Sequence, residues 1–101
     1  MTLPATLAPE AEADLDEAAS WHERQSAGLG VERVSEVRNA LIRVGDQPEA
    51  YPELRPGVSR AQVRRFSYGI CYRVRVDQVE VIGIFHDHRS PRVWQRRARG
   101  G

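Results

Sequence analysis

Alternating apolar and polar side chains between residues 70 and 77 constrain the fold of this chain most strongly. The apolar positions are Ile70, Tyr72, Val74 and Val76. The positions between them are Cys71, Arg73, Arg75 and Asp77. A period of two residues is typical of a β-strand with one face buried and the other facing solvent. We therefore expect a half-buried strand here, within a larger sheet.

A second run, Val79–Phe85, is apolar except for Glu80 and Gly83. Strands that are apolar on both faces usually lie in the middle of a sheet, with a neighbour on each side. Only Asp77 and Gln78 separate this run from the first, which predicts a tight hairpin. The pattern thus predicts a central strand that pairs with the strand before it.

A shorter run over residues 61–66 precedes a break at residues 67–69. We interpret it as the first strand of a three-stranded antiparallel meander, so that the sheet occupies residues 61–86. Residues 46–60 contain three prolines and a glycine, and this composition predicts a loop.

The first half of the chain predicts a short strand and two helices. Residues 1–8 hold apolar side chains at alternate positions, with a proline that only an edge strand tolerates. Residues 9–45 show the period of amphipathic helices, broken near Gly28. The first apolar stripe comprises Ala11, Leu15, Ala18 and His22, flanked by Ala19 and Trp21. The second comprises Val34, Val37, Leu41 and Val44, with Val31 and Ile42 near it. A short connection predicts an antiparallel helical hairpin whose apolar side packs on the sheet.

The composition excludes several classes of protein. At 101 residues, with 41% hydrophobic and 29% charged residues, residues 1–101 have the size and composition of one globular domain. The single cysteine, Cys71, excludes an internal disulfide and a multi-cysteine zinc site. No apolar run approaches the roughly 20 residues of a membrane span, and the start lacks the features of a signal peptide. We therefore expect a cytoplasmic protein with no membrane contact and no cofactor.

The charges of the chain are distributed very unevenly. Residues 1–53 contain eleven acidic residues and four arginines, whereas residues 54–101 contain three acidic residues and eleven arginines. The net charges of the two parts are therefore −7 and +8. Arginine has a fork of donors that suits phosphate and carboxylate groups. The second part is thus expected to meet an anionic partner, either a nucleic acid or an acidic protein surface.

Several short segments accompany this order of expected elements. They are Ala13–Leu15, Pro48–Arg55, Val63–Phe66, Ile70–Val74, Val81–His86 and His88–Trp94. Together, over about residues 3–97, they resemble the RelE/ParE superfamily of bacterial type II toxins. The resemblance implies an α/β (α+β) RelE-like fold: an edge strand, a two-helix hairpin, an antiparallel meander and a short helix within the basic tail, residues 87–101. It also implies a cognate antitoxin from a neighbouring gene, which wraps the toxin with a disordered or helical segment.

Two activities occur in the superfamily that the chain resembles. RelE-like members cut mRNA in the ribosomal A site without a metal, and ParE-like members inhibit DNA gyrase and cut no RNA. Metal-free cleavage of RNA needs a base, an acid and cations that stabilise the charge on the phosphate. In RelE-like toxins the tail carries a basic residue and an aromatic hydroxyl. The matching aromatic here is Trp94, which has no acidic hydroxyl, so the chain departs from the pattern at this position, and His86 and His88 are the candidates to substitute.

The sequence offers candidates for each of these roles. The candidate acid and base are His86 and His88, since an unperturbed histidine titrates near pH 6.5. The candidate phosphate ligands on the strands are Arg64, Arg65 and Arg73. In the tail, Arg89 and Arg92 add charge, and Trp94 is a candidate for stacking on a base. The two histidines do not form a metal site, because alternate residues of a strand point to opposite faces and no third ligand is near.

Structural alternatives remain open for each candidate. Arg73 and Arg75 also fit the solvent face of a sheet or a surface that an antitoxin covers, and Trp94 also fits a hydrophobic core. Inhibition of gyrase requires only a binding surface, and a non-toxic binding module is a third possibility. The two histidines and several arginines near the end of the sheet slightly favour RNA cleavage.

Overall fold

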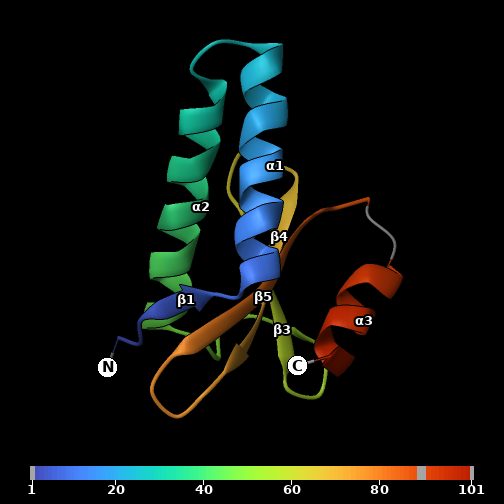
Figure 1. Cartoon of the computed structure of the whole chain (residues 1–101). Coiled ribbons are helices and arrows are strands. Elements are labelled where there is room, and N and C mark those ends of the chain that lie inside the picture. Colours follow the sequence, from blue (N-terminus) through green and yellow to red (C-terminus); the bar gives the residue numbers. More distant parts are fainter. Residues whose placement is uncertain (1, 89–90, 101) are drawn as a thin grey trace.

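The computed structural model describes residues 2–88 and 91–100, which form one mixed sheet with helices on both of its faces (Figure 1). The strands are β1 (Ala5–Leu7), β2 (Glu53–Arg55), β3 (Val58–Gln62), β4 (Tyr68–Val74) and β5 (Val79–His86). The helices are α1 (Pro9–Gln25), α2 (Leu29–Asp46) and α3 (Pro91–Gly100). The strand order is β1-β5-β4-β3-β2. The expected α/β class, with a helical hairpin, a meander and a tail helix, is confirmed.

The short strand β1 lies at one edge of the sheet and pairs with β5 in parallel. Backbone bonds fix both of its ends, since the Leu3 N–H donates to the Gly45 carbonyl and the Ala8 N–H donates to the Val81 carbonyl, each at 2.9 Å. All other strand pairs are antiparallel. The expectation of an edge strand near the N-terminus and of a central Val79–Phe85 strand is therefore confirmed.

Helices α1 and α2 pack side by side against one face of the sheet (Figure 1). The turn between them is held by Glu23, whose carboxylate accepts bonds from the N–H groups of Gly28 and Gly30. Gly28 has a φ of 87°, a left-handed conformation that glycine adopts readily. Gly30 is buried where a Cβ atom would lie 2.7 Å from the Ala19 carbonyl oxygen. These contacts bring the two helices close together and set the angle of the hairpin.

A β-bulge in β5 decides which residues face the helices. Cys71 is paired with Gly83 but Tyr72 is paired with Val81, so Ile82 is the extra residue. The alternation of side chains between the two faces of β5 therefore shifts by one residue at Ile82. As a result, Val79, Val81 and Ile84 belong to the core under α1 and α2, whereas Ile82 and Phe85 belong to the core under α3.

The sheet buries a different hydrophobic core on each face. The face under α1 and α2, here called the hairpin face, buries Ala11, Val37, Ala40, Val44, Ala61, Val63, Phe66, Ile70, Tyr72, Val79, Val81 and Ile84. The opposite face, here called the α3 face, buries Val58, Cys71, Ile82 and Phe85, with Val93, Trp94 and Ala98 of α3 packed on them. Cys71 is thus a packing residue, and burial raises the pKa of its thiol to about 11.

The prediction that residues 46–60 form a loop was wrong, as was the start of the sheet at residue 61. The structure has β2 and most of β3 in this segment, joined by a turn in which Gly57 has a φ of 83°. Residues 63–67 form a turn instead of continuing a strand, closed by a 2.9 Å bond from the Val63 N–H to the Tyr68 carbonyl. Both strands are short and mostly polar, so backbone pairing forms them without a clear apolar period.

The prediction that Val74 and Val76 face the core was also wrong. β4 ends at Val74, and the Arg75 N–H donates to the Gln78 carbonyl at 2.7 Å, which closes the hairpin turn. This turn extends beyond the ends of α1 and α2 (Figure 1). Nothing among the described residues covers its tip, so Val76 is fully exposed. In the described part of the chain, no helix combines the length and the apolar character that crossing a membrane requires.

Candidate functional site

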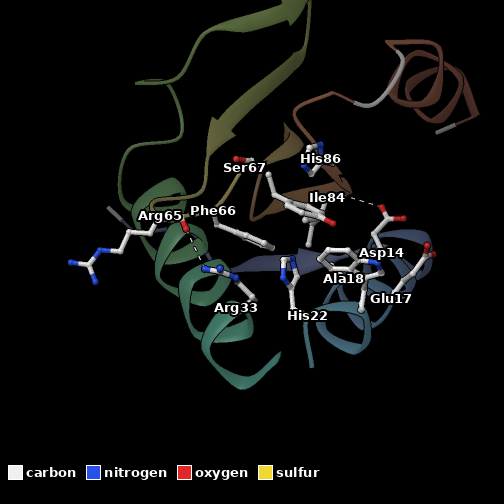
Figure 2. A pocket seen from close by; sticks show the side chains of 12 residues that line it. Asp14, Glu17, Ala18, His22, Arg33, Arg65, Phe66, Ser67, Ile84 and His86 are labelled. Atoms are coloured by element: carbon white, nitrogen blue, oxygen red, sulfur yellow. Dashed lines mark hydrogen bonds between the residues drawn. The ribbon is translucent and has the colours of Figure 1, made fainter. Parts of the chain in front are cut away.

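A pocket of about 520 Å³ opens on the hairpin face, between α1, the start of α2 and the adjoining ends of β4 and β5 (Figure 2). The residues that line it are Asp14, Glu17, Ala18, Trp21, His22, Arg33, Arg65, Phe66, Ser67, Tyr68, Ile84 and His86. They come from four separate parts of the chain. The pocket therefore depends on the tertiary fold.

A row of aromatic rings forms one wall of the pocket. Phe66 and Tyr68 are stacked with their ring centroids 4.2 Å apart. His22 lies edge-on to Phe66 at 4.9 Å, and His86 lies edge-on to Tyr68 at 5.3 Å. His88 continues the row at 5.3 Å from His86. The row thus brings together all three histidines of the chain, although His22 is far from the other two in sequence.

Arg33 crosses the same wall from α2. Its guanidinium carbon lies 4.8 Å from the centroid of the Phe66 ring, within the range of a cation–π contact. Its Nη1 donates to the Arg65 carbonyl at 3.1 Å (Figure 2). Arg65 itself has a φ of 61°, and its side chain extends away from the pocket (Figure 2). Arg33 therefore presents charge to the interior, whereas Arg65 lies at the rim.

Two nitrogen atoms of this pocket are buried without a hydrogen-bond partner among the described residues. They are Nε2 of His22 and Nε of Arg33. Burial, the positive charge of Arg33 and then that of His86 lower the pKa of His22. His22 is therefore neutral at pH 7 and has one nitrogen that accepts a proton. The arrangement suits the binding of an anionic oxygen or the transfer of a proton.

The acidic side of the pocket is already occupied by an internal ion pair. Asp14 of α1 accepts two bonds from Arg97 of α3, at 2.7 and 3.0 Å, and a third from the Ile84 N–H at 3.0 Å. Arg97 also donates to the Ile82 carbonyl at 3.0 Å. The pair with Asp14 raises the pKa of Arg97. Asp14 is thus engaged in fastening α3 to the rest of the fold, and Glu17 is the exposed carboxylate of the pocket.

Of the residues predicted from sequence, His86 and Arg65 line this pocket. His88 is adjacent, and its N–H donates to Nδ1 of His86 at 3.1 Å. Arg64 lines a separate groove of about 440 Å³ with Arg43 and others. The structure therefore brings together one arginine and two histidines of the predicted set.

The other predicted residues lie at the α3 face or in the tail. The Arg73 guanidinium donates to the Ala98 carbonyl of α3. Trp94 packs against the core of the α3 face, and Arg92 is exposed on α3. Arg89 lies outside the described residues. Arg73 and Trp94 are thus separated from His86 by the sheet itself.

Sequence reasoning missed His22 and Arg33 as members of the site. The signal for His22 was present, because it falls on the apolar stripe of the first helix and therefore has to face the sheet. No comparable signal marks Arg33, whose role depends on the position of the turn at residues 63–67. Within residues 2–88 and 91–100, no three His, Cys, Asp or Glu side chains are grouped so as to hold a metal ion.

Comparison with known proteins assigns the chain to a family. Residues 5–91 match the family described as ParE toxin of type II toxin-antitoxin system, parDE. A solved structure, described as the chromosomal ParDE TA system from P. aeruginosa, superposes with a TM-score of 0.61 at 16% identity. The match covers 84% of this chain and 96% of that one, and it supports the fold. No curated protein matches the sequence. The expected RelE/ParE resemblance is confirmed, and the chain belongs to the ParE toxin family of type II toxin–antitoxin systems.

Proposed function

We propose that this toxin arrests growth by binding DNA gyrase and that it does not cut mRNA. One observation carries the proposal: two of the three arginines expected to clamp a phosphate lie away from the histidines, and the third, Arg65, lies at the pocket rim with its side chain extended away (Figure 2). Arg73 is bound to α3 on the far face of the sheet, and Arg64 lines a separate groove. We therefore favour inhibition of gyrase over the RNA cleavage that the sequence alone slightly favoured.

The physical reason is the geometry that metal-free cleavage demands. A base, an acid and the cations have to reach a single phosphate within hydrogen-bond distance in the transition state. A phosphate near His86 is separated from Arg73 by the thickness of the sheet. A binder of gyrase has no such requirement, since its affinity is spread over a surface. Membership of the ParE family supports the same mode of action.

RNA cleavage is the second candidate, and one specific feature favours it. The pocket combines His22, His86 and Arg65, with the pKa of His22 lowered by burial and by the charges beside it. A neutral histidine near a second histidine and a cation is a workable set for proton transfer. A cognate antitoxin is the expected partner under either mode of action.

The two candidates are distinguished with purified protein. We expect the chain to inhibit the supercoiling of relaxed plasmid by gyrase. We expect ribosome-bound mRNA to remain intact in a primer-extension assay. If that mRNA is cleaved, and if His86→Gln reduces the cleavage rate about 10²-fold or more, the chain is a nuclease instead. Activity in neither assay would favour the non-toxic binding module. Arg38→Gln is the control, because this exposed arginine of α2 lies outside the pocket lining.

A further inference from the structure

We propose that the pocket binds the carboxylate of an acidic side chain in a peptide segment of a partner protein, held between His22 and Arg33. This proposal rests on the proposed function, in which the toxin acts by binding a protein. It adds the chemical group of that protein which the pocket recognises.

The pocket contains two buried nitrogen atoms that have no hydrogen-bond partner among the described residues. Nε2 of His22 and Nε of Arg33 come from neighbouring helices, line the same pocket and have no partner among the described residues. Buried polar groups in folded proteins are nearly always hydrogen-bonded, so two exceptions in one cavity require an explanation. A single anionic group placed between them satisfies both.

Arg33 can exchange its present hydrogen bond for one to a ligand. Its guanidinium donates to a neutral carbonyl, that of Arg65, and otherwise rests on the Phe66 ring. Both unpaired nitrogens are covered by neighbouring side chains, so a ligand reaches them when Arg33 turns away from Arg65. A hydrogen bond to a carboxylate is roughly twice as strong as one to a neutral carbonyl. The exchange is therefore favourable, and it opens the path to His22.

The acidic surface around the pocket favours the carboxylate of a peptide over the phosphates of a nucleic acid. Residues 9–46, which form the helical hairpin, contain nine acidic residues and four arginines. Glu17 stands at the pocket itself. A polyanionic backbone is repelled by this surface, whereas a single carboxylate between basic neighbours complements it. Trp21, half exposed at the rim, offers apolar contact for the flanking peptide.

Binding also draws a proton to His22. The groups that face or adjoin this ring are Arg33 of α2, Tyr68 of β4, His86 of β5, and Asp14 and Glu17 of its own helix. In the empty pocket, burial and then the nearby positive charges lower the pKa of the ring and keep it neutral. A bound carboxylate reverses this field, so the imidazolium forms and donates to the ligand. The pKa of His22 is therefore a direct readout of occupancy.

The experiment follows the three histidines of the full chain by NMR across a pH titration. Acetate is compared with chloride at equal ionic strength, and inorganic phosphate is the third probe. Acetate is expected to raise the pKa of His22 by about one unit at saturation. The response is expected to vanish in Arg33→Gln, to persist in part in Arg33→Lys, and to be unchanged in Arg38→Gln, a control on the outer side of the same helix.

A second arm uses capped peptides to separate a peptide carboxylate from a free small acid. Lys-Leu-Glu-Leu-Lys is expected to act at lower concentration than acetate, and Lys-Leu-Gln-Leu-Lys to have no effect. The proposal is overturned if acetate and chloride act alike, if phosphate acts where acetate does not, if Arg33→Gln retains the response, or if the two peptides are equivalent. None of these outcomes depends on gyrase, so failure here leaves the proposed function to its own assay.

Discussion

The two faces of the sheet use their partly buried basic side chains differently. On the α3 face, the guanidinium groups are bound by other parts of the chain: Arg97 by Asp14, Arg60 by Asp87, and Arg73 by the Ala98 carbonyl, although Nε of Arg73 is unpaired. On the hairpin face, His22 and Arg33 share a cavity in which both have an unpaired nitrogen. The arginines of the α3 face therefore hold the fold together, whereas the hairpin face retains groups for a ligand.

The two faces also differ in how much apolar surface they bury. The core of the hairpin face has twelve buried residues among those described, and that of the α3 face has four. Stability is roughly proportional to the apolar area removed from water. The hairpin face therefore provides most of the stability, and α3 is a smaller unit that the ion pair between Arg97 and Asp14 helps to fasten.

The largest expected loss in the free energy of unfolding comes from truncating a core side chain of the hairpin face. Ile84→Ala removes a fully buried side chain from the larger core and is expected to lower the free energy of unfolding by about 2–5 kcal/mol. Urea denaturation followed by circular dichroism measures the change. Val93→Ala, in the half-buried part of α3, is the matched truncation and is expected to lower it by about 1 kcal/mol. Equal losses would contradict the division of stability between the faces.

The second effect is a pH dependence that comes from the α3 face. Because burial raises the pKa of Cys71 to about 11, the unfolded chain releases this proton at lower pH than the folded chain does. The free energy of unfolding is thus expected to fall by up to about 2–3 kcal/mol as the pH rises from 9 to 11. Cys71→Ala removes this part of the slope. Tyr72, whose pKa is also raised by burial, contributes equally to both proteins. Identical slopes would show that the thiol is not buried under α3.

The third effect concerns the ion pair that fastens α3. Asp14→Asn keeps an acceptor for the Ile84 N–H but removes the charge that holds Arg97. Local opening of α3 is expected to accelerate modification of Cys71 by a thiol reagent about 5–30-fold. Glu80→Gln is the control, because it breaks the more exposed pair with Arg75 and leaves α3 in place. An unchanged rate in Asp14→Asn would mean that apolar packing alone holds the helix.

The smallest effect is expected at His22. Its lowered pKa means that, just below pH 6.5, the unfolded chain binds a proton that the folded chain does not. The free energy of unfolding therefore decreases as the pH falls through this window. His22→Gln is expected to flatten this dependence in thermal unfolding between pH 7 and 5, whereas His88→Gln is not. A steeper dependence in His22→Gln would contradict the assignment of His22 as a neutral group.

Much of the fold was predictable because periodicity reports burial. The α1 stripe and the apolar run of β5 each span enough residues for their period to identify the element and its buried side. The strands β2 and β3 were missed because they are short and polar and are formed by backbone pairing, β3 with β4 and β2 with β3. The bulge at Ile82 has no signature in the alternation, and yet it decides the face on which His86 lies.

The site was less predictable because the role of a cation depends on its tertiary partner. Arg97 and Asp14 are 83 residues apart, and nothing local in sequence marks them as a pair. Arg73 lies on a strand with the period expected of a solvent-facing arginine, but α3 covers it. His86 and Arg65 were identified as members of a group of histidines and arginines near one end of the sheet, where side chains from different segments meet.

Growth arrest in a bacterial host shows whether the pocket of the hairpin face, and not the α3 face, acts on gyrase. The chain is induced in a bacterial host, and incorporation of labelled thymidine and labelled leucine is followed for the wild type, Arg33→Gln and Arg73→Gln at equal soluble protein levels. We expect the wild type and Arg73→Gln to stop thymidine incorporation first, and Arg33→Gln to lose this effect. Early loss of leucine incorporation, or arrest that depends on Arg73 and not on Arg33, would contradict the account.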